Sequence, residues 1–254
     1  MQLVPIPALR DNYIWLFGDD QGKALVVDPG EADPVQHEIA RRGITLTHIL
    51  LTHHHADHIG ASMELAQACG ARIVAPHDKR IAHADQRVDD GDIIVLQQPE
   101  CRFRVIAVPG HTLSHVAFFG EGILFCGDTL FSLGCGRLFE GTPEQMLTSL
   151  DRLSALPAET RVCCGHEYTL DNAAFAQSVE PENPALADRI RQAKGQRRQG
   201  QATLPSSLAS ERNANPFLRV DSPQLKAWAK GNQIADDRIQ RFAALREAKD
   251  RFKS

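Results

Sequence analysis

The chain has 254 residues, 43% of them hydrophobic and 24% charged, which is ordinary for a globular protein with a sizeable core. Its net charge of -4 argues against the strongly basic surface of a nucleic-acid-binding protein, and no apolar run approaches the roughly 18 residues of a membrane span. The N-terminus lacks the basic start and apolar core of a signal peptide, so we expect a mature, cytoplasmic protein.

The first two thirds of the chain alternate predicted strands with a few helices. Apolar runs at residues 12–18 and 23–30 are joined by the turn sequence DDQG, which predicts a β-hairpin. An amphipathic pattern predicts a helix at 32–43, and an apolar run predicts a strand at 47–53, followed by a helix at 58–70. Further strands are predicted at residues 71–76, 92–97, 103–110, 115–120, 122–128 and 161–166, and a helix at 142–156 with Thr142 as its N-cap.

Strand patterns disappear after His166. Helix-like patterns cover residues 168–181, 183–200, 222–232 and 236–252. We therefore predict a mixed α/β domain over residues 1–165 and a helical domain over 166–254. The polar stretch at 194–207 predicts a loop, and its basic cluster is more typical of a solvated face than of a nucleic-acid site.

The six cysteines are typical of a reduced cytosolic protein. They form no CxxC pair, and the adjacent Cys163 and Cys164 lie in an apolar run that resembles a buried strand. We expect all of them to be reduced thiols, and most of them to be buried.

Metal-competent residues cluster between positions 53 and 58. In an extended segment His53 and His55 lie on the same side, so they can converge on one ion. Asp57 and His58 follow where the chain turns into a helix, and they could serve a second ion. Histidine and carboxylate side chains suit zinc, iron and manganese.

Three later residues extend this cluster, each at the end of an apolar run. They are His111, Asp128 and His166. A single histidine at a strand end is usually structural, but strand ends are also where distant segments can meet. Together with the cluster at 53–58, these residues predict a metal centre.

The pattern HxHxDH with these partners resembles the metallo-β-lactamase superfamily. This resemblance implies an α+β fold, an αββα sandwich with the metals at one edge, followed here by a small helical domain. It also implies that His53, His55 and His111 bind one ion, that Asp57, His58 and His166 bind a second, and that Asp128 bridges the two. His54 would be a spectator, and Asp28 in VVDPG would orient ligands. Ser114 stands where the family most often has glycine.

Two divalent ions held by Asp57, Asp128 and histidines would retain a positive charge. Such a site lowers the pKa of a bound water and stabilises an oxyanion, so no serine or cysteine nucleophile is required. The sequence has no GxSxG, GxGxxG or Walker motif. We expect two divalent ions per chain, with zinc preferred and iron or manganese as alternatives.

The C-terminal third resembles one family within that superfamily, glyoxalase II. The segments that carry the resemblance are residues 203–219 and 244–253, together with GDTLFSLGCGRLFEGT and CGHEYT in the preceding part. The resemblance implies hydrolysis of S-D-lactoylglutathione to D-lactate and glutathione by a hydroxide that bridges the metals, in methylglyoxal detoxification. Residues 1–165 would be catalytic, and residues 166–254 would recognise glutathione in a protein expected to be a monomer.

The same resemblance implies a set of substrate contacts. Arg246 and Lys249 would hold the glycine carboxylate of glutathione, and three residues apart on a helix they share one face. Arg137, Phe139 and Tyr168 match other contact positions. The family often has lysine at the position of Arg137 and tyrosine at that of Phe139, and phenylalanine cannot replace a hydroxyl contact.

Three other readings remain open. A persulfide dioxygenase on the same fold would also use glutathione derivatives, and oxygen uptake with glutathione persulfide would distinguish it. An RNA-processing nuclease shares the HxHxDH motif but is disfavoured by the acidic balance. A structural metal module would be expected to have a closed, often cysteine-rich site.

Overall fold

The structure is a computed structural model that describes residues 1–252. It divides into two compact units. Unit 1 comprises Met1–Ala107, Ser114–Gly127 and Cys163–His166, and unit 2 comprises Val108–Leu113, Asp128–Val162 and the chain from Glu167 on. The predicted domain boundary at residues 165/166 stays a prediction.

Unit 1 contains a six-stranded sheet that is half antiparallel and half parallel. Its order is β1 (Gln2–Ala8), β2 (Asn12–Gly18), β3 (Lys23–Val27), β4 (Thr45–Leu50), β5 (Arg72–Pro76) and β6 (Gln86–Val88). Strands β1, β2 and β3 pair antiparallel, which confirms the predicted hairpin, whereas β3 to β6 pair parallel. Helix α1 (Asp33–Arg42) connects β3 to β4 and ends at Gly43, as predicted. Gly43 adopts the left-handed conformation.

A second sheet in unit 1 packs against the first. Strands β7 (Ile93–Gln97), β8 (Glu100–Ala107), β9 (Val116–Gly120) and β10 (Ile123–Gly127) form an antiparallel meander, and the end of β13 (Arg161–Cys164) lies beside β10. The rings of Phe17 in β2 and Phe103 in β8 lie 6.0 Å apart, edge to face, between the two sheets.

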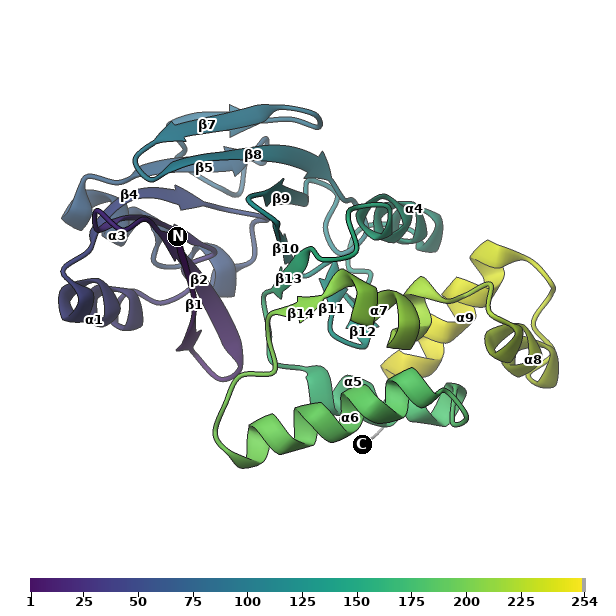
Figure 1. Cartoon of the computed structure of the whole chain (residues 1–254). Coiled ribbons are helices and arrows are strands. Elements are labelled where there is room, and N and C mark those ends of the chain that lie inside the picture. The colour runs from purple at the N-terminus through teal and green to yellow at the C-terminus, as the bar shows by residue number, and fades with distance from the viewer. Residues whose placement is uncertain (253–254) are drawn as a thin grey trace. The chain divides into compact units, whose positions relative to one another are not determined.

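Helices cover the other face of the first sheet. Val35 of α1 and Leu65 of α3 (Ser62–Cys69) are buried in one cluster with Ile14 and Leu16 of β2. Because β2 alternates its side chains between this cluster and the second sheet, all seven of its residues are buried. Unit 1 is therefore built from three layers: helices, first sheet and second sheet (Figure 1).

Unit 2 is mainly helical. Its elements are β11 (Leu130–Phe131), β12 (Gly134–Cys135), α4 (Pro143–Ser154), α5 (Thr169–Val179), α6 (Pro184–Arg198), β14 (Ser206–Ser207), α7 (Leu208–Ala214), η1 (Pro216–Leu218), α8 (Pro223–Gly231) and α9 (Arg238–Arg251). Thr142 is the N-cap of α4, as predicted, and it forms a capping box with Gln145. The four helices predicted after His166 are confirmed as α5, α6, α8 and α9.

Two expectations for this unit were wrong in detail. The loop predicted at 194–207 begins only after Arg198, because α6 continues through the basic cluster from an N-cap at Asn183. Strand structure also persists after His166, since Ser206 and Ser207 pair with Val162 and Arg161 at the start of β13. A two-residue strand is too short for an alternating pattern to reveal it.

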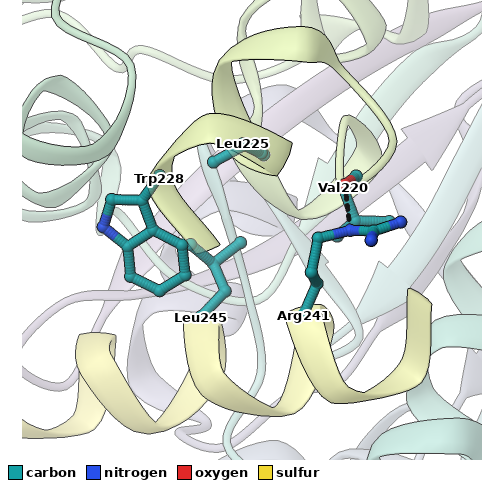
Figure 2. Close-up of a pocket in the computed structure, with 5 residues that line it drawn as sticks. All are labelled: Val220, Leu225, Trp228, Arg241 and Leu245. Atoms are coloured by element: carbon teal, nitrogen blue, oxygen red, sulfur yellow. Dashed lines mark hydrogen bonds between the residues drawn. The ribbon is translucent and has the colours of Figure 1, made fainter. Parts of the chain in front are cut away.

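Helix α9 packs on α4 and α8 within unit 2 (Figure 1). Figure 2 shows Leu225 and Trp228 of α8 facing Leu245 of α9. Arg241 is buried beside them and donates a hydrogen bond of 3.0 Å to the Val220 carbonyl, as the dashed line in Figure 2 marks. None of the helices in residues 1–252 has the length and apolar character needed to span a membrane.

Candidate functional site

The predicted metal-binding cluster follows strand β4 in unit 1. Residues 51–55 continue the chain to the short helix α2 (Ala56–Ile59), which begins after an extended His55. His53 is fully buried, and its Nε2 atom lies 3.1 Å from Nδ1 of His55. The extended backbone thus brings the two side chains together, whereas the α-helical turn carries Asp57 and His58 onward.

Asp28 contacts two residues of this segment, Thr52 and His58. It lies after β3 with a φ of 53°, and its Oδ1 accepts a hydrogen bond of 2.7 Å from the Thr52 amide. Its Oδ2 accepts the Thr52 hydroxyl at 2.7 Å and lies 3.1 Å from His58 Nδ1. Asp28, His53 and His58 are close enough to hold an ion. Because both Asp28 oxygens already accept hydrogen bonds, an orienting role fits this residue better than a ligand role.

A second group in unit 1 consists of Asp57, His58 and His166. One ligand atom from each lies within 4.8 Å of the others. Asp57 Oδ2 is 3.4 Å from Nε2 of His58 and 3.4 Å from Nε2 of His166. Two residues that sequence reasoning missed support this group. Asn12 donates a 3.0 Å hydrogen bond to Asp57 Oδ2, and Asp11 Oδ1 lies 2.8 Å from His166 Nδ1.

Backbone contacts explain how these distant segments meet. Tyr13 donates its amide to the Gly165 carbonyl at 2.8 Å, and Asn12 forms an isolated β-bridge with His166. Gly30 lies so close to the metal-binding segment that an added Cβ would be 1.9 Å from the Asp57 carbonyl oxygen. Only glycine therefore fits at this position of the VDPG turn.

His111 and Asp128 form the corresponding group in unit 2. Both are buried, and His111 Nε2 lies 3.5 Å from Asp128 Oδ2. His111 Nδ1 lies 2.9 Å from the Arg137 carbonyl oxygen. An added Cβ at Gly136 would come within 1.9 Å of the Asp128 carbonyl oxygen, so the GCGR segment needs glycine there.

Three of the candidate histidine ligands are oriented in the same way. In His58, His111 and His166 the Nδ1 atom faces a carboxylate or carbonyl oxygen. A carbonyl only accepts, so Nδ1 of His111 carries the hydrogen and Nε2 presents its lone pair. Metal-binding histidines in proteins are usually held in this way.

The distances within each unit fit divalent ions. Two ligand atoms at about 2.1 Å from a tetrahedral ion are separated by about 3.4 Å. The pairs His53–His55, Asp57–His58, Asp57–His166 and His111–Asp128 span 3.1, 3.4, 3.4 and 3.5 Å. The donors are nitrogen and carboxylate oxygen, which zinc, iron and manganese all accept. The His/Asp clusters therefore suit a binuclear metal site.

His54 belongs to none of the candidate ligand groups found among residues 1–252. Its Nδ1 lies 3.5 Å from Oδ2 of Asp78, which also accepts a 2.5 Å hydrogen bond from the Ser114 hydroxyl. The side chain of Arg80 bonds to the same carboxylate and holds the pKa of Asp78 well below its usual range. Ser114, the residue that departs from the family pattern, thus has a partner of its own.

The predicted substrate contacts lie in unit 2, three of them as a cluster of cations. Lys249 is half-buried and donates to the Asp171 carbonyl at 3.2 Å, with its Nζ 5.7 Å from the centre of the Phe175 ring. Burial, together with the charge of Arg246, lowers the pKa of Lys249. Arg246 is buried and donates to the Cys135 carbonyl at 2.7 Å.

A carboxylate that sequence reasoning did not single out joins this cluster. Asp250 Oδ1 lies 3.0 Å from Arg246 Nη2 and 3.4 Å from Arg137 Nε. Arg246 and Asp250 are four residues apart on one helix, a spacing that could have suggested their pairing. The approach of Arg137, more than a hundred residues earlier, has no local signal.

The two aromatic contact positions differ in exposure. Phe139 is 63% exposed, and its ring lies 5.2 Å from that of His111. The ring of Tyr168 lies 5.2 Å from that of Phe131. An exposed phenyl ring beside a candidate ligand can offer apolar contact to a substrate, but not a hydrogen bond.

Comparison with protein families gives two matches that together cover almost the whole chain. Residues 8–166 match the metallo-beta-lactamase superfamily, and residues 167–252 match the hydroxyacylglutathione hydrolase C-terminus. A hydroxyacylglutathione hydrolase of Xylella fastidiosa is 52% identical over 255 residues, covering 99% of this chain and 98% of the relative. One from Xanthomonas campestris pv. campestris is 50% identical, with complete coverage of both.

Solved structures show the same fold at lower identity. ETHE1 from Myxococcus xanthus has a TM-score of 0.65 and 26% identity, covering 91% of this chain and 100% of that one. BLEG-1 B3 metallo-beta-lactamase also has a TM-score of 0.65, with 22% identity, covering 86% of this chain and 99% of its own.

Proposed function

The chain belongs to the hydroxyacylglutathione hydrolase, or glyoxalase II, family of the metallo-β-lactamase superfamily, and we propose that it hydrolyses S-(2-hydroxyacyl)glutathione thioesters. The predicted fold class, an α+β metallo-β-lactamase sandwich followed by a helical region, is confirmed. The observation that carries the function is the identity of about one half with hydroxyacylglutathione hydrolases over the full chain, helical region included. The substrate implied by the family is S-D-lactoylglutathione, an intermediate of methylglyoxal detoxification.

We propose that two divalent ions are bound, with zinc preferred over iron or manganese. His53, His55 and His111 would hold the first ion, Asp57, His58 and His166 the second, and Asp128 would bridge them. The family pattern supports this assignment, as do the spacings between donors within each unit. Bound metal would supply a water nucleophile of lowered pKa and a Lewis acid for the thioester carbonyl.

The chain's own residues prepare this chemistry. Asp28 and Asp11 fix the rings of His58 and His166 with Nε2 directed at Asp57, and Asn12 fixes the Asp57 carboxylate. Their role is to keep the donors in place without rearrangement during the reaction. The leaving thiol of glutathione has a pKa of about 8.5, so it can depart as a thiolate without a general acid.

Recognition of the tripeptide is assigned to the cations of unit 2. Lys249 and Arg246 would meet the glycine carboxylate, with Arg137, Tyr168 and Phe139 as further contacts. Cations that lie close to one another suit a carboxylate, and the matched helical region supports this role. We propose that residues 1–165 form the catalytic part of the chain and that residues 166–254 form the part that recognises glutathione.

The small-molecule partner of the enzyme would be the glutathione thioester. We propose that the enzyme is a cytoplasmic monomer that binds neither nucleic acid nor membrane. The net charge of -4 supports the exclusion of nucleic acid. The relatives that match over the full chain are hydroxyacylglutathione hydrolases, so they support thioester hydrolysis better than the alternative activity, persulfide dioxygenation.

Metal analysis of the purified protein, paired with two activity assays, tests this proposal. We expect about two divalent ions per chain after reconstitution and rapid hydrolysis of S-D-lactoylglutathione. Oxygen uptake with glutathione persulfide should be absent. A stoichiometry that stays near one ion, or oxygen uptake without thioester hydrolysis, would overturn the assignment.

A further inference from the structure

Asp250 occupies the middle of the cation cluster proposed to bind glutathione. A single oxygen of this residue, Oδ1, is within reach of both Arg246 Nη2 and Arg137 Nε. Lys249 precedes it on α9, and its pKa is also affected by the charges of Arg137, Arg246 and Asp250. Three cations therefore share one small region with the Asp250 carboxylate, and the Asp171 carboxylate also acts on Lys249, which leaves a net charge of +1.

Arg246 cannot receive a second carboxylate in this arrangement. Its side chain is 6% exposed, and Nη1 is committed to the Cys135 carbonyl. The guanidinium carbon lies over the Phe217 ring, 5.2 Å from its centre, which favours the cation in this position. Of its other two nitrogen atoms, Nε is buried, and Nη2 donates to Asp250 at 3.0 Å. An incoming carboxylate must take over this donor.

A further nitrogen atom of Arg246, Nε, could donate an additional hydrogen bond to a ligand. Nε is buried and has no hydrogen-bond partner among residues 1–252. Nε and Nη2 form one edge of the guanidinium, which matches the two oxygens of a carboxylate. Asp250 engages only Nη2 of this edge, whereas a ligand carboxylate could engage both atoms. Asp250 is 39% exposed, so its side chain can turn toward solvent.

We propose that Asp250 is a built-in counter-ion, which holds Arg246 and Arg137 in the free enzyme and is exchanged for the glycine carboxylate when glutathione thioesters bind. This inference rests on the proposed function and adds a residue that opposes substrate binding. Asp250 compensates the cations when the site is empty, and its charge repels the carboxylate that replaces it. The substrate is thereby bound less tightly than the three cations alone would allow.

The test is Asp250→Asn, which keeps the shape and removes the charge. We expect the KM for S-D-lactoylglutathione to fall by about 3- to 10-fold, because a like charge a few ångströms away is removed from a partly solvated site. The value of kcat should change little, since the glycine carboxylate is remote from the scissile bond. The dissociation constant of S-methylglutathione, which cannot be hydrolysed, should fall by the same factor.

Two controls separate this effect from a general change of charge. Glu247→Gln removes one negative charge from an exposed position of the same helix, where Glu247 pairs with Arg251, and should leave both constants unchanged. S-Methylglutathione with its glycine carboxylate amidated should bind equally to wild type and Asp250→Asn. Asp250→Ala serves as a second variant, and it should also bind S-methylglutathione more tightly.

The outcomes are distinct. Tighter binding by both Asp250 variants, with no change for the amidated ligand, supports the exchange. An unchanged or larger dissociation constant overturns it, and a larger one would mean that Asp250 positions the cations instead. If wild type neither binds S-methylglutathione nor hydrolyses the thioester, the proposed function fails, which is a separate result.

Discussion

Replacement of Lys249 separates recognition from chemistry. Its Nζ donates to the Asp171 carbonyl and lies near the Phe175 ring, so the ammonium is partly desolvated and fixed in place. A charge-assisted hydrogen bond is worth about 1.5–3 kcal/mol, and partial exposure reduces this to about 1–2 kcal/mol. We therefore expect Lys249→Ala to raise the KM for S-D-lactoylglutathione by about 5- to 30-fold. The charge of the glycine carboxylate does not change during the reaction, so kcat should stay within about twofold.

Steady-state kinetics with two substrates provide the assay. Lys249→Met keeps the aliphatic stem near Phe175 and should match the alanine variant, whereas Lys249→Arg should retain most of the affinity. A thioester that lacks the glycine carboxylate should be hydrolysed equally by all of them. If kcat instead falls on both substrates while KM holds, Lys249 supports the fold or the metals, and the recognition argument is wrong.

Asp128→Ala should reduce metal content at both sites, whereas His54→Ala, whose ring faces Asp78, should leave it nearly intact; elemental analysis decides, and equal losses would contradict the ligand assignment. Burial lowers the pKa of Lys249, so its charge is lost as pH rises at a value below the ordinary 10.5. Binding of S-methylglutathione should therefore weaken as pH rises toward 10.5, and Lys249→Arg should remove this dependence. Ser114→Ala loses the hydrogen bond to Asp78 and should lower the free energy of unfolding by about 0.5–1.5 kcal/mol, measured by urea denaturation; an unchanged midpoint would assign the bond no weight.

Local patterns predicted much of this fold because each depends on residues close in sequence. The turn between β2 and β3, the Thr142 cap of α4 and the helices after His166 are of this kind. The cluster at 53–58 is equally local, because six consecutive residues are enough to predict an extended segment followed by a helical turn. Strand β1 was missed because Pro5 and Pro7 interrupt its pattern. Proline is tolerated there because β1 is an edge strand, paired on one side only.

The supporting residues were beyond such reasoning. Asp11 lies in a turn before β2 and meets His166 across 155 residues of sequence. Arg137 reaches Asp250 across more than a hundred residues. Neither carboxylate stands in a recognisable motif, and their roles depend on which segments the tertiary structure brings together. Propensity and periodicity carry no information about pairings of this range.

The interrupted course of unit 1 along the chain has a consequence for its synthesis. A ribosome releases the polypeptide from the N-terminus, and contiguous domains can fold as they emerge. Unit 1 cannot be completed in this way, because its last segment, Cys163–His166, lies beside β10 and supplies the partner of Asp11. Unit 1 can therefore be completed only after residue 166 has left the exit tunnel, when residues 128–162 have already been synthesised. A chain stalled before that point would expose the edge of β10 and hold Asp57 and His58 without His166.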